Sequence, residues 1–166
     1  MNQQQLLAEC LALQQSFSSL LLATADISGE PLTSFAPYVE VDGSFYVLLS
    51  DLAQHTCNMQ ENPRASVMFI EAEESAKNIY ARRRAVIQVS VHQLGRTSER
   101  SVNVLELMLS RHGGTVAVLK GLSDFNVYEL RPITGRYVIG FAKAYDWDVQ
   151  ENTLTLVSAE SLKGAS

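Results

Sequence analysis

Three consecutive arginines, Arg82, Arg83 and Arg84, form the densest positive charge in the sequence. A guanidinium donates two parallel hydrogen bonds, which suits a phosphate or carboxylate group. If these residues open a strand, alternation places Arg82 and Arg84 on one face and Arg83 on the other. The pattern predicts an anion-binding face. The alternative is a solvated strand edge whose charge is balanced by the glutamates between positions 71 and 74.

A second group of polar residues surrounds the start of a predicted helix over 52–61. It consists of Ser50, Asp51, His55 and Asn58. Asp51 is expected to cap this helix. Free amides and the positive end of the helix dipole favour an anion there, which makes the group a candidate binding site. The alternative is that the first two residues only cap the helix and that His55 is an ordinary surface side chain.

Several common catalytic patterns are missing from the sequence. It contains no G-x-S-x-G elbow, no Walker A motif and no G-x-G-x-x-G loop. Its two cysteines and three histidines lack the spacing of a zinc site. Asp124, between Ser123 and Phe125, is by itself most simply a turn or cap residue. The sequence therefore gives no support for a hydrolase, for the usual ATP and NAD sites, or for a structural metal.

Hydrophobic spacing predicts the elements that must position these residues. One stripe predicts a helix over 3–16, and another predicts a helix that two glycines stop at 113–114. The two stripes are Leu6, Cys10, Leu13 and Phe17, and Val102, Leu105, Leu109 and His112. Apolar or alternating runs predict strands over 20–25, 33–41, 44–49, 64–70, 84–91 and 154–157. Asp42-Gly43 marks one hairpin turn, and 126–131 with 136–141, joined through Pro132 and Gly135, predicts a last hairpin.

Many short strands with few helices favour an α+β fold, a small antiparallel barrel with peripheral helices. The 166 residues predict a single domain over 1–166, with an N-terminal helix in 1–17 and a tail at 158–166. Thirteen basic and eighteen acidic residues give a net charge of −5, which disfavours nucleic-acid binding. The longest apolar run, 45–49, is short of the roughly 18 residues of a membrane span, and the N-terminus lacks the charge of a secretion signal. The expected location is the cytoplasm.

Several motifs in this order resemble the split-barrel superfamily of the pyridoxamine 5′-phosphate oxidase type, and more closely its haem-utilisation branch. The similarity spans 20–145. The motifs are Leu21-Leu22-Ala23-Thr24 with Gly29-x-Pro31, Ser34-Phe35-Ala36-Pro37-Tyr38-Val39, Ser50 through His55 to Asn58, Asn62-Pro63-Arg64, Ala81-Arg82-Arg83-Arg84, Leu122-Ser123-Asp124-Phe125, and Gly140-Phe141-Ala142-x-Ala144. The resemblance implies a mainly antiparallel six-stranded split barrel that forms a homodimer and binds its cofactor in a cleft made by both subunits.

The resemblance also implies roles for particular residues. In flavin-binding members, a lysine at the position of His55 and an Arg-Gln pair at those of Arg83 and Arg84 contact FMN. The second-strand cations of such enzymes are absent here. In haem-utilisation members, a tail histidine ligates the iron and an aspartate orients it; Asp124 matches that aspartate, whereas 158–166 contains no histidine. No metal ligand is therefore predicted.

Three hypotheses follow for the function. The leading one is a haem-binding dimer that assists oxidative haem degradation and iron release, as a haem-degrading oxygenase, with Arg82 and Arg84 on the anionic groups and Asp124 behind the iron ligand. The second is an FMN-dependent oxidoreductase of the same barrel type. The third is a cofactor-free binding or regulatory barrel. The predicted cofactor-binding residues are Ser50, His55, Asn58, Arg82, Arg83, Arg84 and Asp124.

Overall fold

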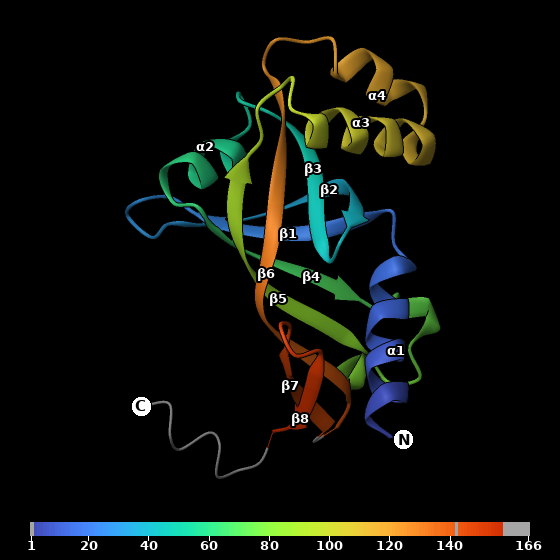
Figure 1. The fold of residues 1–166 in the computed structure, drawn as a ribbon. Coiled ribbons are helices and arrows are strands. Elements are labelled where there is room, and N and C mark those ends of the chain that lie inside the picture. The colour runs from blue at the N-terminus through green and yellow to red at the C-terminus, as the bar shows by residue number, and fades with distance from the viewer. Residues whose placement is uncertain (1, 142, 158–166) are drawn as a thin grey trace. The chain divides into compact units, whose positions relative to one another are not determined.

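The structure is a computed structural model that describes residues 2–141 and 143–157. The chain forms two compact units, and each is described by itself (Figure 1). The first contains the described parts of Met1–Phe17, Met68–Ile87 and Ile133–Ser166, and the second contains Ser18–Val67 and Gln88–Pro132. In chain order the elements are α1 (Gln3–Gln15), β1 (Ser19–Ala25), β2 (Pro31–Val41), β3 (Ser44–Ser50), α2 (Gln54–Glu61), β4 (Arg64–Ile70), β5 (Arg84–Gln93), α3 (Glu99–His112), α4 (Gly114–Leu119), β6 (Phe125–Gly140), β7 (Lys143–Asp148) and β8 (Thr153–Leu156).

The described strands form one sheet that closes on itself. Its order is β3-β2-β1-β4-β5-β6, and an additional pairing of β3 with β6 closes these six strands into an antiparallel barrel. β7 and β8 continue the sheet beyond β6. The prediction of an α+β fold built on a six-stranded antiparallel barrel is confirmed.

Alternating side chains fill the barrel part of the second unit. Leu20, Leu22 and Thr24 on β1 are buried, and the residues between them are exposed. The rings of Tyr38 and Phe45 pack edge to face, with centroids 5.7 Å apart. The predicted turn between β2 and β3 is confirmed, since positions 42 and 43 both have positive φ, as a tight hairpin requires. These strands therefore form a rigid frame that positions the residues at their ends.

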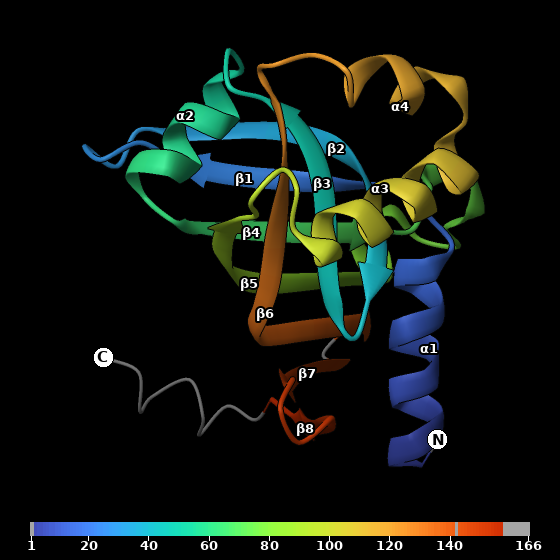
Figure 2. The same ribbon diagram turned by 45° about the horizontal axis from the view of Figure 1, so that its top comes forward.

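Helices α3 and α4 form a second core with β2, β3 and β6 in this unit (Figures 1 and 2). The buried members of this core are Val39, Tyr46, Val104, Met108, Val116 and Val127. The predicted stripe on α3 was wrong by about one residue: Ser101, Val104 and Met108 are buried, whereas Val102 is exposed and Leu105 and Leu109 are only partly buried. α4, which begins directly after the glycine stop at Gly113, was not predicted.

The first unit contains α1 and the last strands. The predicted stripe on α1 is confirmed, since Leu6, Cys10 and Leu13 are buried and the ring of Phe17 packs at 6.3 Å from that of Phe69. Gln3 Nε2 donates to the carbonyl oxygen of residue 154 on β8 at 3.5 Å. α1 is thereby held against the final strand pair.

The predicted hairpin after position 126 was wrong, because β6 runs without a break over sixteen residues. It pairs with β3 through its first part and with β7 from Gly135 onward. Pro132 lies between these two ladders, where its missing N–H removes no bond from either. Proline and glycine suggested a turn, but pairing on both sides of them keeps the strand extended. β7 itself was not predicted.

None of the helices described is both long and apolar enough to cross a membrane.

Candidate functional site

In the second unit, the junction between β3 and α2 holds Asp124 in place. Ser50 Oγ donates to Asp124 Oδ2 at 2.6 Å, and the Asp51 N–H donates to the Asp124 carbonyl at 2.8 Å. Ser50 Oγ in turn accepts a hydrogen bond from the Leu52 N–H at 3.1 Å. Within residues 2–141 and 143–157, Asp124 Oδ1 has no hydrogen-bond partner. The carboxylate is thus fixed in one orientation with one oxygen free to accept a further bond.

Asp51 does not cap α2, which corrects the sequence prediction. The helix begins at Gln54, and its cap residue Ala53 makes no side-chain cap bond. The Asp51 carboxylate instead accepts from Asn126 Nδ2 at 2.8 Å, from Tyr128 Oη at 3.1 Å and from Gln60 Nε2 at 3.2 Å. This cluster ties α2 to β6.

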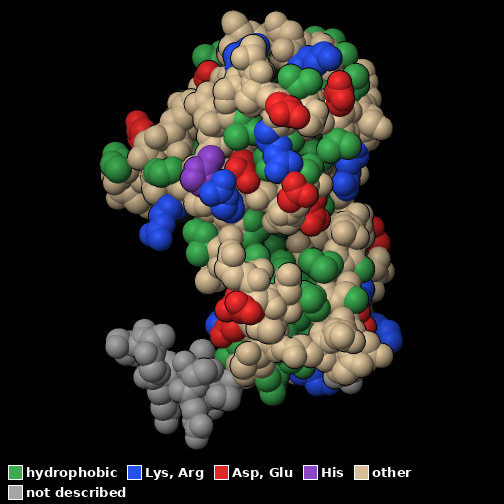
Figure 3. Space-filling view, in the orientation of Figure 1, with side chains coloured by type: hydrophobic (Ala, Val, Ile, Leu, Met, Phe, Trp, Pro, Cys, Tyr) green, Lys and Arg blue, Asp and Glu red, His purple; other side chains and the backbone are tan. Residues whose placement is uncertain are grey.

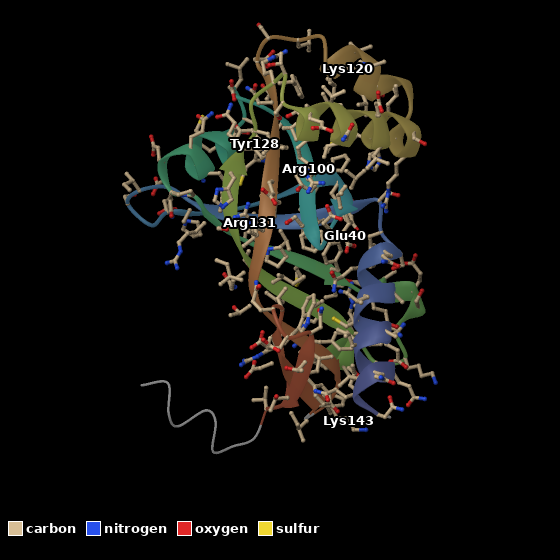
Figure 4. All side chains as sticks on the ribbon, in the orientation of Figure 1. Glu40, Arg100, Lys120, Tyr128, Arg131 and Lys143 are labelled. Carbon is tan, nitrogen blue, oxygen red and sulfur yellow. The ribbon has the colours of Figure 1, made fainter. Side chains whose placement is uncertain are left out.

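Tyr128 lies in the middle of this hydrogen-bonded cluster between α2 and β6 (Figure 4). Its hydroxyl donates to Asp51 and accepts from Gln60 Nε2 at 3.0 Å. Burial raises the pKa of Tyr128 to about 12, so the phenol keeps its proton and remains a donor at neutral pH. No local sequence pattern indicates this cluster, because its members lie far apart along the chain.

His55 lies on the first turn of α2 and is half-buried. Its Nδ1 is 3.0 Å from Ser34 Oγ, and that hydroxyl donates to the Leu22 carbonyl at 3.2 Å. When the serine donates its proton to the carbonyl, the histidine donates from Nδ1, and this tautomer keeps a lone pair on Nε2. Burial lowers the pKa of His55, which favours the neutral imidazole. The arrangement gives the tautomer that binds a metal or accepts a proton through Nε2.

The other two histidines have different surroundings. His112 Nε2 is 2.9 Å from the Tyr38 carbonyl, so that nitrogen is occupied by the protein. His92 is exposed, with its Nε2 at 3.1 Å from Ser90 Oγ. Within residues 2–141 and 143–157, His55 is therefore the histidine of the three whose Nε2 has no partner.

Asn58 is a buried link between α2 and β1. Its Nδ2 donates to Thr24 Oγ1 at 3.1 Å, and its Oδ1 accepts from Gln54 Nε2 at 2.9 Å. Both amide atoms have protein partners. This position secures the helix that carries His55, and its predicted contact with a cofactor stays a prediction.

The arginine triplet belongs to the first unit, and β5 begins only at Arg84. The expected alternation therefore does not apply. Arg82 donates to the Glu71 carbonyl through Nε at 2.8 Å and pairs with Glu73 at 3.1 Å, and Arg83 pairs with the Glu71 carboxylate at 2.9 Å. The backbone N–H of Arg83 and its guanidinium lower the pKa of Glu71. Glutamates thus balance the charge of the first two arginines.

Arg84 differs from its neighbours. It is half-buried, and its Nη1 donates to the Arg82 carbonyl at 3.2 Å. In the part of the chain that the structure describes, no carboxylate pairs with it. Of the three arginines, Arg84 keeps its charge available for an anionic ligand.

Charges of both signs are intermixed on the face shown in Figure 3. In the second unit, Arg100 pairs with Asp42 at 2.9 Å and Arg131 with Glu129 at 3.0 Å. Both partners of the Arg100–Asp42 pair are exposed, and such a pair contributes only about 0 to 1 kcal/mol, whereas Glu129 is mostly buried. This face therefore has local pairs rather than an extended field of one sign.

The closed antiparallel barrel defines the class of the protein, and comparison with known proteins specifies it. The family model for pyridoxamine 5′-phosphate oxidase matches residues 6–139, and the chain belongs to this family. The predicted family membership is confirmed, including its haem-utilisation branch.

One relative in that branch has a name that refers to haem. The chain is 37% identical over 132 residues to the haem oxygenase HutZ of Vibrio cholerae, which is 80% of this chain and 75% of the relative. A crystal structure of HutZ, described there as a haem storage protein, aligns with a TM-score of 0.72 and 35% identity. The alignment covers 76% of this chain and 89% of the HutZ chain. The structure of Campylobacter jejuni ChuZ covers 96% of this chain with a TM-score of 0.85 and 29% identity, and this chain spans 65% of that one.

Proposed function

We propose that this protein binds haem and acts in haem utilisation. The observation that carries the proposal is the 37% identity over 132 residues to a haem oxygenase of the same barrel family. Bound haem would supply the oxygen chemistry, and the protein would supply orientation and a partly dry surrounding.

Residues of the second unit fit such a group. A neutral imidazole is an ordinary ligand of haem iron, and His55 has its Nε2 lone pair free. Ser34 fixes the ring through Nδ1, as the outer partners of metal-bound histidines commonly do. Among the described residues, His55 is the proposed ligand of the haem iron. The tail at 158–166, where the family's ligand is expected, lies outside them.

Asp124 would act as an acceptor toward the bound ligand. Its Oδ2 is held by Ser50, so its free Oδ1 has a defined direction. The resemblance implies that this carboxylate orients the N–H of a tail histidine. Because 158–166 contains no histidine and the Nδ1–H of His55 is directed at Ser34, its donor here would be a water molecule at the bound ligand. Ser50 would then position Asp124 rather than contact the ligand.

A homodimer in the cytoplasm is part of the proposal. The outer face of β1 and β2 is mostly apolar and carries no charged side chain: its exposed residues are Ser19, Leu21, Ala23, Pro31, Thr33, Phe35 and Pro37. Leu21 lies directly opposite Phe35, whose side chain is 64% exposed. An exposed apolar face of this kind marks an interaction surface, and a second copy of the chain is the occupant that the family favours.

Titration of the purified protein with hemin tests the function. A saturable Soret band near one haem per subunit is expected, and His55→Ala is expected to weaken binding and shift the band, whereas His92→Ala serves as the matched control. A wild-type protein without a saturable Soret change would refute haem binding. Saturation that His55→Ala leaves unchanged in affinity and band position would refute His55 as the ligand.

FMN is the second candidate, favoured by the match to the pyridoxamine 5′-phosphate oxidase family model. The positions that correspond to flavin contacts are His55, Arg83 and Arg84, and Arg83 is already paired with Glu71. The protein would be mixed with FMN and passed through gel filtration. Flavin absorption bands that remain, together with no saturable Soret change on hemin titration, would favour FMN as the cofactor.

A further inference from the structure

Arg96 lies in the connection between β5 and α3, beside the connection from α4 to β6 (Figures 1 and 2). Its guanidinium donates to three carbonyl oxygens of the second connection: Nη1 to Ser123 at 2.7 Å and Phe125 at 3.1 Å, and Nη2 to Leu122 at 3.0 Å. These carbonyls flank Asp124 on both sides. A single side chain therefore fixes the backbone that presents the Asp124 carboxylate.

The remaining carbonyl of this stretch, that of Asp124 itself, accepts from the Asp51 N–H. Asp124 is thus held from two directions, by Arg96 through its neighbours and by the β3–α2 junction through Ser50 and Asp51. The backbone of the β5–α3 connection is itself anchored, since the Leu94 N–H donates to the Val127 carbonyl at 2.9 Å. Both parts of the arrangement belong to the second unit.

The chemistry requires an arginine at this position. A guanidinium carries five N–H donors in a rigid plane and can serve three acceptors at once, whereas a lysine ammonium is a point charge on a flexible stem. Within the described residues, Arg96 has no ion pair with a carboxylate. Its donors are used on the backbone of the connection.

We propose that Arg96 is a positioning residue for the ligand site: it fixes the 122–125 backbone so that Asp124 Oδ1 points at the bound ligand. The proposal rests on the proposed haem function for its ligand. The positioning itself is a property of the protein without ligand, so the two parts can fail separately.

The ligand-free test is amide hydrogen exchange of Asp51, measured by NMR in the wild type, Arg96→Ala and Arg96→Lys. Both variants are expected to exchange this amide at least about tenfold faster, the factor that corresponds to losing one hydrogen bond to a charged group. Arg100→Ala is the matched control, because Arg100 pairs with Asp42 and bonds to none of these carbonyls. If Arg96→Ala does not fold, Arg96→Lys decides the question. Unchanged Asp51 exchange in the folded variant overturns the proposal.

The test with ligand is a double-mutant cycle on hemin binding. Arg96→Ala and Asp124→Ala are each expected to weaken binding about tenfold and to shift the Soret band in the same way. The double variant should resemble Asp124→Ala alone, because Arg96 acts through Asp124. Effects that multiply, or different band shifts in the two single variants, would mean that Arg96 only stabilises the fold, and would overturn the proposal. A wild type that binds no hemin would refute the proposed function, while the exchange test would still decide the positioning.

Discussion

At the scale of single residues, the most consequential property is the protonation state of His55. Its Nδ1–H is spent on Ser34, and burial keeps the ring neutral. Burial of the neutral ring lowers the free energy of unfolding in acidic solution, because the unfolded chain binds a proton at His55 more readily than the folded chain does. The same feature that prepares Nε2 for a ligand therefore makes stability depend on pH.

The sign of this dependence follows from the lowered pKa. Below the ordinary value of 6.5, the unfolded state binds more protons at His55 than the folded state, so the free energy of unfolding falls as the pH decreases. His55→Gln should lose less stability between pH 7.5 and pH 5 than the wild type, as measured by urea unfolding midpoints. The exposed His92 gives the control, since His92→Gln should keep the wild-type pH dependence. Equal slopes for wild type and His55→Gln would contradict the prediction.

In the arginine triplet, Arg82 and Arg83 are paired with glutamates, whereas Arg84 has no carboxylate partner among the described residues. Arg83→Ala removes a guanidinium already matched by Glu71, whereas Arg84→Ala removes one without a carboxylate partner among the described residues. Arg84→Ala should weaken hemin or FMN binding about tenfold, since a hydrogen-bonded anion contact contributes about 1.5 to 3 kcal/mol. Arg83→Ala should change affinity much less. Equal losses in both variants, measured by absorption titration, would show that the triplet acts only as a diffuse charge.

At the scale of elements, β6 shows how pairing overrides local signals. Gly135 lies opposite Trp147 on β7, and a Cβ atom at position 135 would lie 2.6 Å from Trp147 Cε3. The glycine is there because the indole occupies the space of a side chain, and not because the chain turns. The indole is buried, so it has little freedom to move away.

Gly135→Ala should therefore destabilise the protein by about 1 to 3 kcal/mol through overpacking. Thermal or urea unfolding measures the loss, and the fluorescence of Trp147, the one tryptophan of the sequence, should shift. Gly95→Ala is the control, since no atom lies within 4 Å of a Cβ there. The cost should shrink in a Trp147→Leu background. A cost that persists there would point to the backbone and not to the indole.

The elements also show what could be predicted from the sequence. The strand β1 was predicted from its apolar run, β5 from its alternation and α1 from its stripe, because each of these patterns reports burial over a short stretch. The balance of Arg82 and Arg83 by Glu73 and Glu71 was one of the two predicted alternatives for the triplet. The Asp51 cluster and the carbonyl contacts of Arg96 could not be predicted. Each depends on residues far apart in the chain, which only the closed barrel brings together.

At the scale of the whole molecule, the outer face of β1 and β2 predicts the oligomeric state. Phe35→Asp places a charge in the middle of this apolar face, where burial against a second copy would leave it unpaired. The wild type should be a dimer and Phe35→Asp a monomer in sedimentation velocity at the same concentration. Ile27→Asp, in the exposed turn between β1 and β2, should leave the dimer intact. A monomeric wild type, or a dimer that Phe35→Asp does not weaken, would contradict the prediction.

That the chain forms a single domain stays a prediction. The path of the chain between the two compact units is relevant to it. β4, β5 and β6 each continue from one compact unit into the other, and the first unit is assembled from three separate stretches. Because the side chains of a strand alternate with a period of two, deleting one residue near Pro132 would turn every later side chain of β6 to the opposite face. The three shared strands therefore cannot change in length by a single residue without mispacking. Insertions, tags and natural length differences should be tolerated instead in the stretch between β4 and β5 and in the turn between β7 and β8.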